Sequence, residues 1–441
     1  MIMASYLTGI HLPHRKGTKN VPVARMDVPK TVSIPMAMHI GKPAIPTVKV
    51  GDLVKAGTKI GEADGYISSP VYSSVSGKVT KLADYLMYNG STTTSVVIES
   101  DGEMSVDEAI APPVVGGRED FVNAVKASGI VGLGGAGFPT YVKLDVDPER
   151  IEYLVINGAE CEPYVTSDTI TMLERADDIA IALKAFNQYL GVKNVIIGIE
   201  NNNKKAAASM KKMADALGEV SVKVQLLPTV YPQGGEKVLV YHTTGRRIHA
   251  NELPIDVGCI VLNCTTVASI GAYLKTGMPL VEKCVTVEGG AVKQPQNVIA
   301  PIGATLNDLF DFCGGLKEDP AKIIYGGPMM GITIPNADAP VIKNTNAVLA
   351  LTKKEAKLPK TTACIRCGAC VNTCPFGLAP VSIAEAYGKK DIEALEELSA
   401  LTCMECGCCS FVCPANRPLV QMNKLSKQLL NENKKKEGEK A

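Results

Sequence analysis

The chain has 441 residues, of which 46% are hydrophobic, and this composition excludes a disordered protein. Basic residues number 46 and acidic residues 45, so the net charge of +1 argues against nucleic acid as a partner. No apolar run approaches the roughly 18 residues of a membrane span, and residues 1–19 lack the apolar core of a signal peptide, so we expect a soluble chain that is not exported.

The first 110 residues divide into an arm and a β domain. Residues 1–30 have no sustained hydrophobic period and are predicted to form an extended N-terminal arm. Residues 31–110 hold short β-prone runs between glycine turns, which predicts a barrel-sandwich-like domain. The pattern resembles the biotinyl/lipoyl-carrier sandwich. That family carries its cofactor on a hairpin-tip lysine, but no lysine lies between Lys59 and Lys78, so we interpret the domain as a scaffold and not as a carrier.

Residues 113–264 alternate between apolar runs and helical stretches. The predicted strands are short and the predicted helices amphipathic, which indicates βαβ units around a mainly parallel sheet. The expected strands are residues 151–156, 195–199, 220–227 and 259–262, and the expected helices are residues 119–128, 171–190 and 204–217.

Two smaller domains are predicted to follow. Residues 265–345 contain a hairpin over 284–292 that turns at Gly289 and Gly290, a helix over 306–312 and a strand over 323–325, which fits a β-grasp domain. Residues 355–428 carry clustered cysteines on helical sequence such as 383–398, and residues 429–441 are predicted to be a charged, frayed tail. The expected fold class is therefore a multidomain combination of α/β and α+β parts.

Nine of the 14 cysteines lie within residues 364–413, and eight of these nine form two runs of the form C-x₂-C-x₂-C-x₃-C-P. Both runs match the bacterial two-cluster ferredoxin pattern, in which the fourth cysteine of each run binds the other cluster. Zinc and buried structural cysteines are the alternatives, but zinc sites usually pair two C-x₂-C units across a longer gap. Cys408 falls outside the spacing and is predicted to be a packing residue. The predicted ligands are Cys364, Cys367, Cys370 and Cys413 for one [4Fe–4S] cluster, and Cys403, Cys406, Cys409 and Cys374 for the other.

Two iron–sulfur clusters transfer single electrons, so another group must supply or accept them. The loop GLGGAGFPT (132–140) satisfies G-x-G-x-x-G, but a helical stretch precedes it and Pro139 follows it, so the dinucleotide fingerprint does not apply. The loop offers backbone amides to a flat or phosphorylated ligand, or it is a plain turn. NGAECEP (157–163), YPQGGE (231–236) and NCTT (263–266) end or follow other predicted strands, where ligands bind in such sheets.

These motifs together, with GIHLPHRKGTK (9–19) and the paired cysteine runs, resemble the C subunit of the Rnf ferredoxin:NAD oxidoreductase over nearly the whole chain. Residues 113–264 are also similar to the flavoprotein subunit of respiratory complex I. That resemblance implies a Rossmann-like FMN/NAD domain beside a β-grasp domain of the soluble-ligand-binding type. Three positions depart from the complex I pattern: Leu133 stands for an arginine, Ala159 for an aspartate and Gly235 for a glutamate.

The resemblance also implies site residues. The implied FMN contacts are Gly132, Gly134, Gly135, Lys143, Asn157, Glu160, Tyr231, Gly234, Asn263 and Thr266. The implied NAD contacts are Phe138, Glu162 and Glu236. No side chain is expected to act as a general acid or base, because the cofactors carry the chemistry.

The function implied by the resemblance is that of a peripheral subunit at the cytoplasmic face of the cell membrane. It would exchange hydride between NAD(H) and FMN, and single electrons with two [4Fe–4S] clusters, inside an ion-translocating ferredoxin:NAD⁺ oxidoreductase. The implied partners are ferredoxin-like and integral membrane subunits, ferredoxin through the complex, and NAD(H). Two alternatives stay open: a cobalamin reductase of a bacterial microcompartment, and an electron-relay adaptor without flavin.

Overall fold

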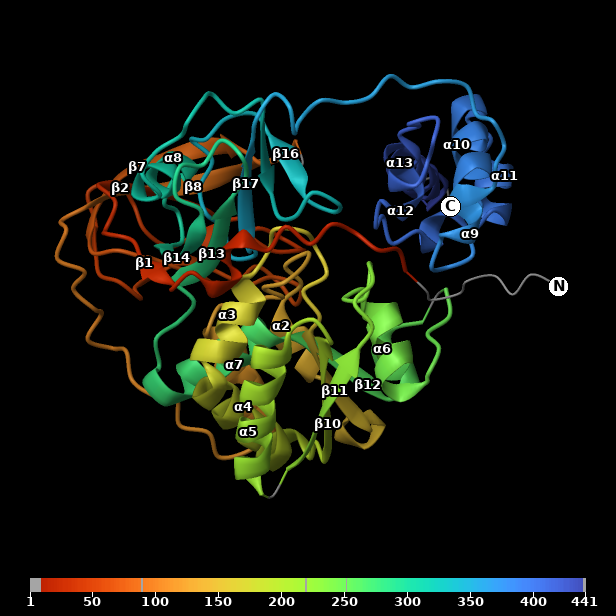
Figure 1. The fold of residues 1–441 in the computed structure, drawn as a ribbon. Coiled ribbons are helices and arrows are strands. Elements are labelled where there is room, and N and C mark those ends of the chain that lie inside the picture. The colour runs from red at the N-terminus through yellow and green to blue at the C-terminus, as the bar shows by residue number, and fades with distance from the viewer. Residues whose placement is uncertain (1–8, 89, 219, 251, 439–441) are drawn as a thin grey trace.

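The computed structural model describes residues 9–88, 90–218, 220–250 and 252–438. The C-terminal helices form a separate body beside the strands and helices of the rest of the chain (Figure 1). Among the described residues, no helix is long and apolar enough to cross a membrane.

Two small sheets make up the β domain, in the orders β2-β8-β7-β4 and β3-β5-β6. In β2, Val32 and Ile34 are buried at alternate positions, and they pair across the sheet with Ile98 and Val96 of β8. This alternation gives the domain one apolar face. The strands are β2 (Thr31–Pro35), β3 (Ile45–Pro46), β4 (Leu53–Val54), β5 (Lys59–Glu62), β6 (Val71–Tyr72), β7 (Gly77–Leu86) and β8 (Thr92–Ser100).

The turn between β5 and β6, where a carrier protein would hold its lysine, packs against the next domain. The ring of Tyr66 meets that of Tyr141, in α2 (Thr140–Leu144), edge to face with the centroids 6.1 Å apart. The Tyr141 hydroxyl also donates a hydrogen bond to the carbonyl of Tyr66. A turn fixed in this way supports the interpretation of the β domain as a scaffold.

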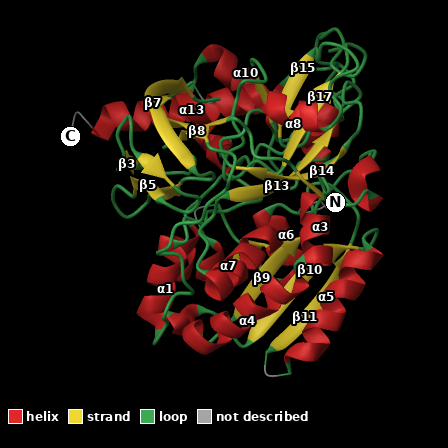
Figure 2. Cartoon of the chain, turned by 90° about the vertical axis from the view of Figure 1, so that its left-hand side faces the viewer, coloured by secondary structure: helices red, strands yellow, loops and turns green. Residues whose placement is uncertain are grey.

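A four-stranded parallel sheet with the order β11-β10-β9-β12 lies at the centre of the α/β domain, with helices packed around it (Figure 2). Leu154, Val155 and Ile156 of β9 are consecutive buried residues, as expected for a strand covered on both faces. The strands are β9 (Tyr153–Gly158), β10 (Asn194–Glu200), β11 (Ser221–Leu227) and β12 (Cys259–Asn263). The longer helices are α1 (Arg118–Ala127), α3 (Ser167–Glu174), α4 (Ala176–Leu190), α5 (Lys204–Leu217), α6 (Glu236–Thr244) and α7 (Cys264–Thr276).

The helix predicted over residues 171–190 is wrong in one respect, because it is two helices. Arg175 lies between α3 and α4 with a φ of −124°. Its guanidinium donates to Asp178 at 2.9 Å and to the carbonyl of Ala268 at 3.1 Å. These bonds stabilise the interruption between α3 and α4. The hydrophobic period of residues 171–190 does not predict this interruption.

A six-stranded sheet follows, in the order β1-β14-β13-β17-β15-β16. The arm supplies its edge strand, β1, which pairs in parallel with β14. The arm is therefore part of this sheet. The elements are β1 (Ala24–Arg25), β13 (Glu282–Glu288), β14 (Gln296–Pro301), α8 (Leu306–Phe312), β15 (Lys322–Tyr325), β16 (Ile332–Ile334) and β17 (Ala347–Leu351).

The predicted hairpin forms, since β13 and β14 pair antiparallel and the amide of Val292 donates to the carbonyl of Gly289 at 3.1 Å, but its second strand needs correction, because β14 begins only at Gln296. The residues after the glycines bond to other segments: the amide of Ala291 donates to Ala350, and Val292 forms a bridge with Leu316. The connection is therefore longer than a tight turn.

The C-terminal body contains α9 (Ala369–Asn372), α10 (Pro380–Lys389), α11 (Ile392–Glu397), α12 (Cys408–Phe411) and α13 (Leu419–Gly438). The helix predicted over 383–398 is broken at Lys390, which has a φ of 55°. The prediction of a frayed tail from residue 429 is wrong for the described part, because α13 continues to Gly438 and Leu430 is buried. Residues 439–441 of that tail, and residues 1–8 of the predicted arm, lie outside the described residues.

The described residues also contain four short 3₁₀ helices, at Gly17–Asn20, Pro148–Arg150, Pro254–Val257 and Ala400–Thr402.

Candidate functional site

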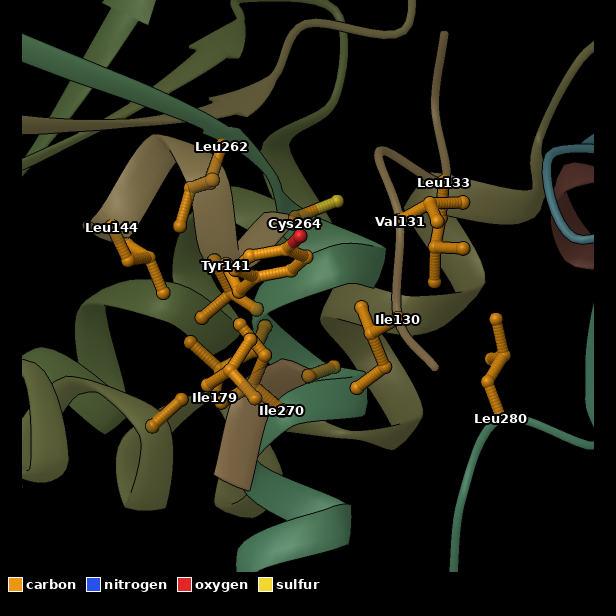
Figure 3. Close-up of a cluster of buried hydrophobic side chains, with 14 of the residues drawn as sticks. Ile130, Val131, Leu133, Tyr141, Leu144, Ile179, Leu262, Cys264, Ile270 and Leu280 are labelled. Atoms are coloured by element: carbon orange, nitrogen blue, oxygen red, sulfur yellow. The ribbon is translucent and has the colours of Figure 1, made fainter. Parts of the chain in front are cut away.

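The glycine-rich loop is closed at its base and exposed at its tip. Val131 and Pro139 form a bridge, and the amide of Gly132 donates to the carbonyl of Phe138 at 2.8 Å. Below the tip, Val131 and Leu133 are buried in the apolar cluster drawn in Figure 3. These contacts hold the loop against the core, while residues 134–136 face outward.

Two asparagines mark the carboxyl ends of adjacent parallel strands. Asn157 of β9 and Asn263 of β12 are register partners in the sheet. The chain leaves β9 toward β10 on one side and returns as β12 on the other, so this is the point where the strand order reverses. Ligands of open α/β sheets bind at such a point.

The loops around this point are connected by hydrogen bonds. Asn157 donates to the carbonyl of Gly234 at 2.9 Å. Thr266, in the first turn of α7, accepts from the amide of Leu133 at 3.0 Å. A Cβ at Gly134 would lie 2.3 Å from Nδ2 of Asn263, so these two residues are in close contact. The structure therefore brings together the loops and strand ends that the sequence singled out.

The tip also leaves space for a ligand. A Cβ built on Gly135 meets no protein atom within 4 Å, and its φ is not in the left-handed region. A flat group can therefore approach the backbone at this position without displacing protein atoms. This geometry fits the flavin that the motifs predict.

Lys143 and Glu236 form an ion pair with Nζ 2.9 Å from Oε1, and Lys143 also donates to the carbonyl of Val261 at 3.3 Å. Both side chains are about one-third exposed or more. The pair therefore lies beside the carboxyl-terminal part of β12. The resemblance had assigned Lys143 to FMN and Glu236 to NAD.

Two predicted contacts have carboxylates that already bind protein groups. Glu160 accepts from the amide of Asp168 at 2.8 Å and from the hydroxyl of Thr169 at 2.8 Å, which caps α3. Glu162 accepts from the amides of Met329 at 3.0 Å and Met330 at 2.7 Å. Burial raises the pKa of both carboxyls, that of Glu162 to about 7.

Tyr231 connects the sheet to the cysteine-rich body. Its backbone exchanges two hydrogen bonds of 2.8 Å with Ile10 of the arm. Its side chain is 1% exposed, and its hydroxyl donates to the carbonyl of Cys406 at 2.7 Å. The side chain of Tyr231 therefore points into the interface with the second cysteine run.

Five cysteines line one pocket: Cys374 of the first run and Cys403, Cys406, Cys408 and Cys409 of the second. Apart from Cys408, these are the cysteines expected for one cluster with an exchanged fourth ligand. Among the described residues, no three His, Cys, Asp or Glu side chains converge closely enough to hold a single metal ion.

The two runs repeat the same backbone path. Arg366 and Glu405 both have a positive φ, of 54° and 62°, and their amides donate to the sulfurs of Cys364 and Cys403 at 3.4 Å. In the first set, Cys370 and Cys413 pack against the same apolar cluster, while Cys367 is exposed. Cys408 is buried, and its sulfur donates to the carbonyl of Tyr231 at 3.8 Å.

Sequence reasoning missed three residues around the site. Asp168 accepts hydrogen bonds from Asn263 and Thr265, both at 2.7 Å. Lys16 of the arm contacts the loop after β9, and the buried Lys283 lies behind the glycine loop, 3.4 Å from the carbonyl of Leu133. Only Lys16 carried a signal, because it belongs to the distinctive motif at residues 9–19.

Four family models match the chain. They are the RnfC barrel sandwich hybrid domain (residues 4–103), the Nuo51 FMN-binding domain (125–272), the SLBB domain (284–333) and the 4Fe-4S dicluster domain (363–417). The chain thus has the predicted multidomain α/β architecture, and its cofactors are FMN and iron–sulfur clusters, as predicted.

Relatives of known name match over most of their length. The C subunit of the proton-translocating ferredoxin:NAD(+) oxidoreductase complex of Clostridium ljungdahlii is 40% identical, over 95% of this chain and 93% of that protein. The Na(+)-translocating counterpart of Acetobacterium woodii is 42% identical, over 95% of each. An NAD+-reducing [NiFe]-hydrogenase structure in the H2-reduced state shares the fold, with a TM-score of 0.50, 18% identity, and coverage of 72% of this chain and 62% of that one.

At this identity over nearly full length, the chain belongs to the family of C subunits of ion-translocating ferredoxin:NAD(+) oxidoreductase complexes.

Proposed function

We propose that this chain exchanges electrons in pairs with NAD(H) and singly with a partner of the complex, through FMN and two [4Fe–4S] clusters. The observation that carries the proposal is the contact between the two candidate sites. Tyr231, from a loop beside the strand ends, bonds to Cys406 of the second cysteine run at 2.7 Å. Gly235 of the same loop lies against Met404, since a Cβ there would be 2.5 Å from its Cε.

FMN, when bound, supplies hydride exchange with nicotinamide and single-electron exchange with the clusters. The protein supplies position and charge. We propose that the glycine-loop amides and Lys143 face the negative charge of the flavin. Glu160 and Tyr231 have side chains and backbone groups that bond to protein partners, so we propose that they shape the loops around the flavin. The proposed FMN contacts are Gly132, Gly134, Gly135, Lys143, Asn157, Glu160, Tyr231, Gly234, Asn263 and Thr266, and the proposed NAD contacts are Phe138, Glu162 and Glu236.

The proposed ligands divide between the runs: Cys374, Cys403, Cys406 and Cys409 hold one cluster, and Cys364, Cys367, Cys370 and Cys413 hold the other. The first of these clusters lies on the side of Tyr231 and the second has the exposed Cys367. We call the cluster that Cys374, Cys403, Cys406 and Cys409 would hold the inner cluster and the other the outer cluster; when bound, they would supply single-electron transfer between the flavin site and the surface near Cys367.

The finer fold assignments belong to the same proposal. The strand order β11-β10-β9-β12 is that of a Rossmann-like half, and the parallel pair β13 and β17 flanked by antiparallel neighbours is that of a β-grasp domain. We also place the chain peripherally, at the cytoplasmic face of the membrane. Its proposed partners are the ferredoxin-like and integral membrane subunits, and ferredoxin through the complex.

The test is an anaerobic rapid-mixing experiment with NADH. We expect the flavin absorbance to bleach first and the cluster absorbance to follow. Tyr231→Phe removes one hydroxyl, so it should leave the bleaching step unchanged and slow the second step several-fold. Tyr241→Phe, in the neighbouring α6, is the control. A protein isolated without flavin would contradict the proposal and favour the adaptor, and corrin reduction in place of ferredoxin-dependent NAD⁺ reduction would favour the cobalamin reductase.

A further inference from the structure

We infer that Lys16 of the N-terminal arm is a positioning residue of the flavin site, holding the loop after β9 in its binding shape. The inference rests on the proposed function, because it assumes that FMN binds at these strand ends. The three hydrogen bonds of Lys16 go to backbone carbonyls and not to the side chain of a proposed ligand contact. Lys16 acts through the backbone of residues 160–165.

Lys16 uses its full hydrogen-bonding capacity on one loop. Its Nζ donates to the carbonyl of Glu160 at 2.7 Å, to that of Glu162 at 2.9 Å, and to that of Val165. An ammonium group has three donors, so none is left over. Three carbonyls within six residues converge on one nitrogen, and this fixes the curvature of the loop around a single cation.

A continuous set of hydrogen bonds leads from that loop to the glycine loop. The loop runs into α3, where Asp168 accepts from Asn263 and Thr265 at 2.7 Å. Asn263 accepts from the amide of Thr266 at 3.3 Å, and the hydroxyl of Thr266 accepts from Leu133 at 3.0 Å. A displacement of residues 160–165 would therefore shift Asn263 and the glycine loop together.

The arm is held by hydrogen bonds on both sides of Lys16. The backbone at Lys16 is therefore already fixed, and ordering it costs little additional conformational entropy. Before it, Ile10 pairs with Tyr231, and the carbonyl of His14 accepts from the amide of Tyr164 at 3.0 Å. After it, the hydroxyls of Thr18 and Thr166 are 2.6 Å apart. The arm thus contacts two of the loops that follow sheet strands, and Lys16 lies between these anchors.

The charge of Lys16 also suits its surroundings. Glu160 and Glu200 are both buried and, with Lys16 and Lys19, line one small pocket at the ends of β9 and β10. Without the ammonium of Lys16, three carbonyls would lose their donor and two carboxyls would lose one of the nearby positive charges. Removing one partner of buried polar groups is costly, because the other groups stay desolvated.

The test is Lys16→Met, which keeps the length of the side chain and removes the donors and the charge. We expect the dissociation constant for FMN to rise at least about tenfold. The visible circular dichroism of bound flavin should change, and the amides of residues 157–166 should exchange hydrogen faster. The electron paramagnetic resonance signals of both clusters should stay, which shows that the rest of the chain is folded.

Lys19→Met is the matched control, because Lys19 lies on the same arm and lines the same pocket as Lys16, but it donates to the exposed carbonyl of Asn202, at 3.1 Å, and not to the loop after β9. It should bind FMN as the native chain does. Lys16→Gln keeps two N–H donors, so its affinity should fall between those of the native chain and Lys16→Met, and it replaces Lys16→Met if that variant does not fold. Native affinity in both Lys16 variants, or equal losses at Lys16 and Lys19, would overturn the inference. Absence of FMN binding by the native chain would instead contradict the proposed function.

Discussion

Gly134 and Gly135 are neighbours in one loop, but a side chain would meet other protein atoms only at Gly134. At Gly134 a side chain would collide with Asn263, since its Cβ would lie 2.3 Å from Nδ2. At Gly135 a Cβ meets no protein atom within 4 Å. The protein itself therefore requires the first glycine, whereas a requirement for the second would come from the flavin that we propose binds there.

Gly135→Val tests whether a ligand occupies the open space at this position, because a Cβ added there meets no other protein atom within 4 Å. The valine methyls would occupy the space where we place the flavin, so we expect loss of FMN from the purified protein with both clusters retained. Iron, sulfide and FMN contents per chain measure this directly. Gly388→Val, at another open glycine in α10, should keep its flavin. If Gly135→Val retained FMN, the loop would not be the binding site.

Glu200, at the end of β10, is 5% exposed, and burial raises the pKa of its carboxyl from 4.5 to about 7. The folded state therefore binds this proton more tightly than the unfolded state. The contribution of Glu200 to stability is most favourable below pH 4.5, declines as the pH rises to about 7, and is constant above that. Lys16 and Lys19 reduce the shift without cancelling it.

Glu200→Gln removes this titration. We expect the variant to match the native chain near pH 4.5 and to be more stable at pH 8, by up to about 3 kcal/mol. Denaturant unfolding between these pH values measures the difference. Glu149→Gln, on the surface, should show none. A gap between the two proteins that stays constant with pH would be evidence against titration of Glu200.

At the scale of elements, the sequence predicted the positions of several helices and strands, but it did not predict the contacts of the loops that connect them. The helices over residues 204–217 and 306–312 match α5 and α8, because a helical period is local. The loops meet partners far along the chain: Glu162 caps Met329 and Met330, 167 and 168 residues away, and Tyr231 reaches Cys406. Spacing identified these residues as unusual but could not identify their partners.

The two cysteine runs exchange one ligand each in the proposed arrangement, and this can be tested element by element. Cys374 belongs to the first run but lines the pocket of the second. Cys374→Ala should therefore abolish the same cluster signal as Cys403→Ala, and Cys413→Ala the same signal as Cys364→Ala. Electron paramagnetic resonance of the reduced variants distinguishes the two signals. If Cys374→Ala instead matched Cys364→Ala, each run would bind its own cluster.

At the scale of the whole molecule, the arm joins parts that the sequence treated as separate. It pairs with Tyr231 through Ile10, holds the loop after β9 through Lys16, and adds β1 to the six-stranded sheet. Tyr231 then joins this assembly to the cysteine-rich body. The domains are thus arranged so that the proposed flavin site at the strand ends and the second cysteine run share one interface.

This arrangement sets the number of electrons that one chain can hold. FMN takes about two electrons and each [4Fe–4S] cluster about one, so the complete chain should take up about four. An anaerobic reductive titration followed by absorbance measures the number. Cys374→Ala should take up about three and Gly135→Val about two, because each variant lacks one defined group. A native chain that took up only about two electrons would lack either the flavin or both clusters, and the conversion between paired and single electrons would then have to occur elsewhere in the complex.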